Sequence, residues 1–116
     1  MRSAICIGTM SLLGVCVGPV AAHAQQGAGG RIRVVAGTYG HNCGRVRGNK
    51  TQHLARACNG RGVCRYTINY KVIGDPAPGC SKDYLAEWRC AGSPYVHRRL
   101  VSPEAGFKKT VELRCR

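Results

Sequence analysis

The sequence predicts a small α+β domain that is rich in disulfides, with mostly antiparallel strands and one short helix. Several short stretches are rich in β-branched residues or alternate apolar with polar residues, and Gly, Pro and Asn separate them. The cysteines point the same way, because an even number follows residue 24: Cys43, Cys58, Cys64, Cys80, Cys90 and Cys115. A small exported domain commonly needs such disulfides to supplement its limited core.

Five stretches are predicted as strands: residues 31–38, 63–70, 84–90, 95–102 and 107–115. One helix is expected over residues 51–58, with Thr51 as its N-cap. Leu54, Ala55 and Cys58 would then share one face of that helix. These elements together predict the α+β class.

The alternation within residues 84–90 predicts which side chains are buried. One face carries the apolar residues Tyr84, Ala86, Trp88 and Cys90. Glu87 and Arg89 lie on the other face and are expected to point outward. Residues 73–82 precede this strand and are expected to form a loop, because they contain two prolines and two glycines.

The first 24 residues have the features of a secretory signal peptide in their usual order. Arg2 precedes an apolar run over residues 4–17, and Ala22-His23-Ala24 supplies a small-x-small cleavage site. We expect cleavage after Ala24. The alternative is a lipoprotein in which Cys16 carries the lipid.

Cleavage there leaves a flexible leader at residues 25–30 and a single domain at residues 31–116. The apolar run at the N-terminus is shorter than the roughly 20 residues that a membrane-spanning helix needs. We therefore expect a secreted or periplasmic protein with no stable membrane insertion.

A set of short motifs keeps a fixed register along the middle of the chain. Tyr39-Gly40 follows the first predicted strand, and residues 58–64 read C-N-G-R-G-V-C. Gly74-Asp75-Pro76 comes ten residues after the second cysteine of that turn; Lys82 follows Asp75 by seven residues, and Cys90 follows Lys82 by eight. Together these motifs resemble the SUEL-type lectin domain, the rhamnose- and galactose-binding lectins of the sea-urchin-egg type.

This resemblance implies a small β-rich domain with a short helix that binds L-rhamnose or D-galactose without metal or other cofactor. The residues expected to bind sugar are Tyr39, Asn69, Asp75, Gly79 and Lys82. A carboxylate suits vicinal sugar hydroxyls because it accepts two hydrogen bonds, and an ammonium can donate beside it. Gly79 would let the backbone approach the ligand closely. The family's sugar-binding glutamate in the first strand has no counterpart in Gly29-Gly30-Arg31.

Simpler structural roles are open for three of these residues. Asp75 could cap a turn in its own loop, in an Asx turn. Lys82 could be a solvated surface lysine, which is the commonest state of that residue. Tyr39 could be a core ring at the end of a strand.

The cysteines are expected to form three disulfides. Cys58 and Cys64 bracket a five-residue turn, so the chain itself keeps them close. The resemblance places Cys43 and Cys80 near the family's loop-to-loop bridge. Cys90 and Cys115 both end predicted strands, and the segment beyond the family's usual end then supplies the last partner. A zinc site is the rival reading, but five residues separate the closest pair where zinc pairs typically have two to four.

The net charge of +13 favours anionic surfaces. The alternative function is therefore a cationic secreted protein that binds anionic envelope polysaccharide or membrane through charge. The sequence contains no recognised nucleic-acid-binding motif, and we expect no nucleic-acid partner.

We expect no enzymatic activity. The histidines of the predicted domain, which are His41, His53 and His97, have no visible serine or cysteine partner motif. A glycosidase needs two carboxylates that flank one bond. Glu87 and Glu112 are expected on outward strand faces, which leaves few acids for such a pair.

Overall fold

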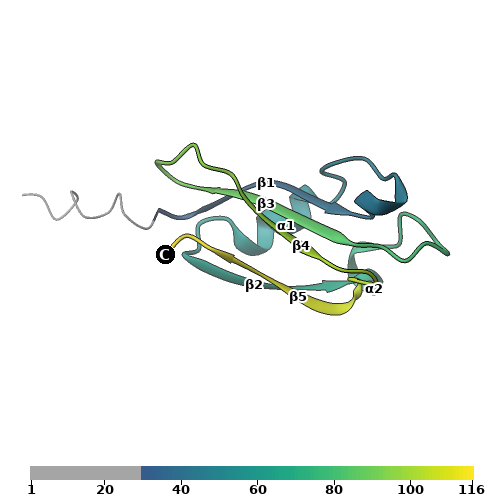
Figure 1. Cartoon of the computed structure of the whole chain (residues 1–116). Helices are drawn as coiled ribbons and strands as arrows, with labels where there is room; N and C mark the ends of the chain where they lie inside the picture. The colour runs from purple at the N-terminus through teal and green to yellow at the C-terminus, as the bar shows by residue number, and fades with distance from the viewer. Residues whose placement is uncertain (1–29) are drawn as a thin grey trace, which may run out of the picture.

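The computed structural model describes residues 30–116, and its strands form two antiparallel sheets (Figure 1). The three-stranded sheet has the order β1-β3-β4 and the two-stranded sheet pairs β2 with β5. The strands are β1 (Ile32–Tyr39), β2 (Val63–Asn69), β3 (Tyr84–Cys90), β4 (His97–Val101) and β5 (Phe107–Arg114). The predicted signal peptide and all but the last residue of the predicted leader lie outside the described residues.

Three helical segments accompany the sheets: η2 (His41–Cys43), α1 (Thr51–Cys58) and α2 (Tyr70–Ile73). The α+β class and the mostly antiparallel strands are confirmed, and α1 has the predicted bounds. Its N-cap is Lys50 rather than Thr51. The Thr51 hydroxyl instead accepts a hydrogen bond from the N–H of Gly37 in β1 at 3.1 Å, which ties the helix to the sheet. The short α2 was not predicted.

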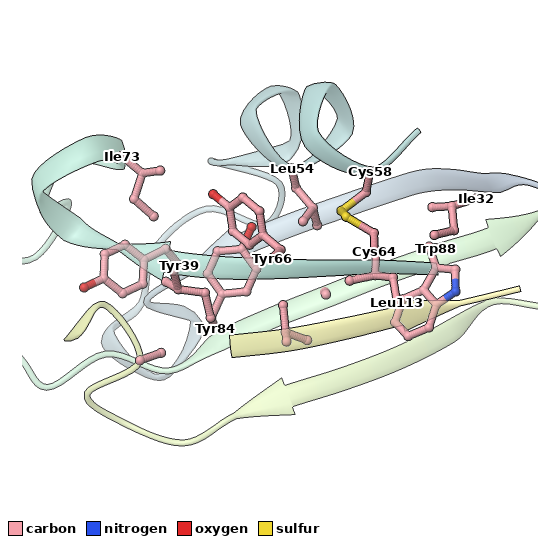
Figure 2. Packing of buried hydrophobic residues seen from close by; sticks show 14 residues of the cluster. Ile32, Tyr39, Leu54, Cys58, Cys64, Tyr66, Ile73, Tyr84, Trp88 and Leu113 are labelled. Carbon is pink, nitrogen blue, oxygen red and sulfur yellow. A yellow bond between two sulfur atoms is a disulfide. The ribbon is translucent and has the colours of Figure 1, made fainter. Parts of the chain in front are cut away.

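The core fills the space between the two sheets and α1 (Figure 2). At one end three tyrosines cluster: the Tyr84 ring centroid lies 6.3 Å from that of Tyr39 and 5.9 Å from that of Tyr66. Toward the other end lie Ile32, Leu54, Trp88, Leu113 and the Cys58–Cys64 disulfide. This burial removes apolar surface from water and holds the two sheets together.

The three predicted disulfides form, with Cα–Cα distances of 6.3 Å for Cys43–Cys80, 5.3 Å for Cys58–Cys64 and 5.5 Å for Cys90–Cys115. They act in different places. The first joins two loops at the Tyr84 end of β3, the second links α1 to β2 inside the core, and the third joins the two sheets at the Cys90 end of β3. Both ends of the domain are therefore held covalently.

Glu87 lies on the predicted face of β3, but it is not exposed. Its side chain is 1% exposed, because Arg47 and Arg98 cover it. The Arg47 Nε donates to Oε1 at 3.0 Å, and the Arg98 Nε lies 3.2 Å from Oε2. The loop that carries Arg47 folds back over the outer face of the sheet. A buried carboxylate is tolerated only when such partners compensate its charge.

No helix among residues 30–116 is long and apolar enough to cross a membrane.

Candidate functional site

Lys82 lies at the centre of the candidate site and is buried. Its side chain is 4% exposed, so the solvated-lysine interpretation is wrong. The Nζ atom lies 2.9 Å from Oδ1 of Asp75 and 3.1 Å from Oε1 of Glu104, and it donates to the carbonyl of Cys80 at 2.7 Å. The ammonium is thus neutralised by two carboxylates, as a buried cation requires.

The loop before Lys82 is shaped by its own side chains. Asp75 Oδ1 accepts a hydrogen bond from the N–H of Ala77 at 3.1 Å, so this residue caps its turn and also pairs with Lys82. Gly79 has a φ of 81°, which L-residues with a side chain rarely adopt. A Cβ at Gly79 would meet no atom within 4 Å. The positive φ of this turn, rather than a lack of space for a side chain, therefore explains why glycine occupies position 79.

Glu104 is the main site residue that the sequence analysis missed. Its Oε1 accepts from the N–H of Lys82 at 2.8 Å, and its Oε2 accepts from the N–H of Gly106 at 2.7 Å and from the Tyr39 hydroxyl. Burial alone would raise the pKa of this carboxyl. The hydrogen bonds from Tyr39, Lys82 and Gly106 outweigh burial and lower the pKa of Glu104 to about 2.

Tyr39 is both a core ring and a lining residue of the site. Its side chain is fully buried, and its ring centroid lies 5.3 Å from the Lys82 ammonium. Burial and the adjacent Glu104 carboxylate raise the pKa of the Tyr39 hydroxyl. In Figure 2 its ring extends away from Tyr84 and Tyr66, with the hydroxyl at the edge of the cluster.

These side chains line a cavity of about 380 Å³, which we call the Lys82 cavity. Its lining residues are Tyr39, Tyr70, Asp75, Gly79, Cys80, Ser81, Lys82, Glu104 and Phe107. Four of the five predicted sugar-binding residues are therefore brought together. The volume falls within the range of about 300–1,000 Å³ that is common for small-molecule sites.

Asn69 is the predicted site residue that does not line this cavity. Its side chain caps α2, because Oδ1 accepts from the N–H of Lys71 at 3.0 Å. It lines a neighbouring cavity of about 260 Å³ that shares Tyr70 and Phe107 with the Lys82 cavity.

One wall of the Lys82 cavity is aromatic. Tyr70 and Phe107 pack edge to face, with ring centroids 5.7 Å apart and an interplanar angle of 65°. Phe107 is 69% exposed, although a large apolar side chain is normally buried. An exposed aromatic ring and the carboxylate of Asp75 therefore line the same cavity. Alternation over residues 107–115 predicts that Phe107 shares the buried face of Val111 and Leu113. The register shifts between Ile68 and Asn69, opposite Lys109 and Phe107, and this irregularity breaks the alternation and leaves the ring exposed.

Among the charged side chains of the cavity, Asp75 is the one that is open to a ligand. Its side chain is 34% exposed, and both the hydrogen bond from Ala77 and the ion-pair contact with Lys82 are made by Oδ1, so Oδ2 has no hydrogen-bond partner within the part of the chain that the structure describes. Lys82 differs, because its contacts with Asp75, Glu104 and Cys80 engage its three donors. Lys82 therefore positions the two carboxylates, and Asp75 can accept hydrogen bonds from a bound molecule.

The histidines lie apart from this cavity. His53 Nδ1 is 2.7 Å from the Tyr66 hydroxyl, and His97 stacks on Trp88. No group of three or more His, Cys, Asp or Glu side chains in residues 30–116 is placed to hold a metal ion.

No protein-family model, curated protein or solved structure matches this chain.

Proposed function

We propose that this chain is an exported lectin of the SUEL type and that the Lys82 cavity binds a neutral, rhamnose- or galactose-like monosaccharide without metal or catalysis. One observation carries the proposal: the open carboxylate oxygen of Asp75 and the exposed ring of Phe107 line the same small cavity. Three disulfides support export, because such bonds persist in oxidising compartments.

The chemistry of the cavity suits a sugar. Vicinal hydroxyls can donate to the free oxygen of Asp75, and the apolar face of a pyranose ring can pack on Phe107. The ion pairs of Lys82 with Asp75 and Glu104 hold the acceptor in one orientation before the ligand arrives. A preorganised acceptor of this kind reduces the entropy lost on binding.

Two carboxylates line the Lys82 cavity, as in a glycosidase, but Glu104 is unsuited to act as the general acid. A glycosidase needs a carboxylic acid whose pKa is raised, so that it is protonated and can donate to the leaving group. Glu104 has the opposite property, because its pKa is lowered to about 2. It is an anion at any neutral pH.

The proposal is tested by calorimetric titration of the mature protein with rhamnose, galactose and glucose. Asp75→Asn keeps the oxygen that caps the turn but removes the charge, and it should weaken binding by about 1.5–3 kcal/mol. Phe107→Ala removes an exposed ring and should weaken binding without loss of stability. Val46→Ala is the matched control, because Val46 is 77% exposed and lies outside the cavity.

Rhamnose or galactose should bind more tightly than glucose, and Val46→Ala should bind as the wild type does. Absence of neutral-sugar binding, or unchanged affinity in both cavity variants, would contradict the proposed function. Affinity for the neutral sugar should also change less than about twofold between low and high salt, because no ion pair forms with the ligand.

A further inference from the structure

A second, larger cavity lies where the two sheets meet without pairing. β4 pairs only with β3, and β5 pairs only with β2, yet β4 and β5 lie beside each other (Figure 1). The seam between them holds a cavity of about 700 Å³, which we call the β4–β5 groove. It shares no lining residue with the Lys82 cavity.

The groove has a rigid floor. The Cys90–Cys115 disulfide joins β3 to the end of β5, and both cysteines line the groove. The Trp88 Nε1 donates to the carbonyl of Arg114 at 3.0 Å, which is a second tie between the two sheets. The two walls are therefore held at a fixed separation.

The groove is strongly cationic. It is lined by Arg98, Arg99, Arg114 and Arg116, and Glu112 is the one acidic side chain among its lining residues. Arg98 is engaged by the buried Glu87, and Arg114 by Glu112. Neither Arg99 nor Arg116 forms an ion pair within 4 Å in residues 30–116. Arg114, Arg65 and Arg99 together lower the pKa of Glu112, and the Arg116 side chain lies beside Gly62, so an anion would bind Arg99 and Arg116 in competition with these contacts alone. A guanidinium donates two parallel hydrogen bonds that match a carboxylate.

Aromatic rings form a short stack at the His97 end of the groove. His97 lies on Trp88 with ring centroids 5.3 Å apart and an interplanar angle of 16°. Tyr95 meets His97 edge to face at 4.7 Å and is 65% exposed. Trp88 is buried, so Tyr95 is the ring that a ligand can reach.

We propose that the β4–β5 groove binds a linear acidic polysaccharide, with sugar carboxylates on Arg99 and Arg116 and a sugar ring against Tyr95. The charge of the walls is complementary to such a chain, and the concave shape suits an extended polymer. A flat bilayer reaches the walls of a groove poorly. Single-stranded nucleic acid stacks its bases on successive exposed aromatics, whereas this groove offers one.

The test is titration of the mature protein with polygalacturonate, a polymer of uronic acid, and with neutral dextran of similar length. The double variant Arg99→Ala/Arg116→Ala should lose about tenfold or more in affinity for polygalacturonate, and Tyr95→Ala should lose a few-fold. Arg98 is left intact, because it covers the buried Glu87. Binding of the wild type should weaken with added salt, since ion pairs carry it.

Arg33→Ala/Arg89→Ala is the matched control, because these two exposed arginines are paired across β1 and β3 outside the groove. It removes the same charge and should change affinity less than about twofold. Equal losses in the two double variants would show that diffuse charge binds the polymer and would overturn the proposal. It is likewise overturned if poly-dT or phosphatidylglycerol vesicles bind as tightly as polygalacturonate with the same dependence on Arg99 and Arg116.

Discussion

The Lys82 cavity and the β4–β5 groove have opposite electrostatics within one strongly basic domain. The cavity surrounds a single ammonium with the carboxylates of Asp75 and Glu104, whereas the groove has four arginines and only Glu112. The net charge of the protein is therefore reflected in the β4–β5 groove but not in the Lys82 cavity. A neutral ligand fits the first region, and a polyanion fits the second.

The difference follows from where the acids lie. Each of the five acidic side chains has a partner. Asp75 and Glu104 pair with Lys82, and Glu87 and Glu112 pair with arginines. Asp83 accepts a hydrogen bond from the N–H of Asn42 at 3.2 Å. The remaining arginines and lysines are left on the surface. The positive net charge is thus what remains after the five acids have formed local pairs. This excess of positive charge is concentrated in the β4–β5 groove because β4 and the C-terminal segment carry several arginines.

The largest contrast between the two regions should appear in stability. Lys82→Ala leaves the largely buried carboxylate of Glu104 and the partly exposed carboxylate of Asp75 without their cation, which should reduce the free energy of unfolding by about 3–5 kcal/mol. Arg99→Ala in the groove removes an exposed charge and should change it by less than about 0.5 kcal/mol. Urea denaturation of both variants measures the two effects. A loss below about 1 kcal/mol in Lys82→Ala would mean that the ion pairs do not hold the site.

Removal of the Cys90–Cys115 disulfide should affect the β4–β5 groove but not the Lys82 cavity. Cys90→Ala/Cys115→Ala removes a bridge between residues 25 positions apart and should cost about 3.5 kcal/mol of stability. Because this bridge forms the floor of the groove, polygalacturonate binding should weaken, whereas binding in the distant Lys82 cavity should persist below the unfolding temperature. Loss of both activities in the folded variant would mean that the two regions are not independent.

Sequence reasoning succeeded where structure depends on neighbours along the chain. The alternation of apolar residues fixed β2 and β3, and the short turn between Cys58 and Cys64 fixed their pairing. The burial of Lys82 was missed because it depends on Glu104, which lies 22 residues away in a segment that has the composition of a surface turn. Glu87 was misjudged for the same reason, because the loop that covers it comes from 40 residues earlier.

The smallest of these effects is the loss of stability at acidic pH, and it should distinguish Glu104 in the cavity from Glu112 in the groove. The pKa of Glu104 is lowered to about 2 in the folded protein, below its ordinary value of 4.5. The folded state therefore binds fewer protons than the unfolded state in this range, so the stabilisation is present above pH 4.5 and is lost as the pH falls toward 2. The loss should reach about 2–3 kcal/mol across that window.

Urea unfolding at a series of pH values measures this loss. In Glu104→Gln, the plot of unfolding free energy against pH should be flatter between pH 4.5 and 2, the part of the plot that we call the acid limb. Arg114 also lowers the pKa of Glu112, but that carboxylate is reached by solvent. Its ion pairs are screened and contribute little, so Glu112→Gln should leave the acid limb nearly unchanged. An acid limb that survives Glu104→Gln and disappears in Glu112→Gln would reverse the comparison. The groove would then carry the stabilising charge pair, and the hydrogen bonds of Glu104 would serve only to orient Lys82 and Tyr39.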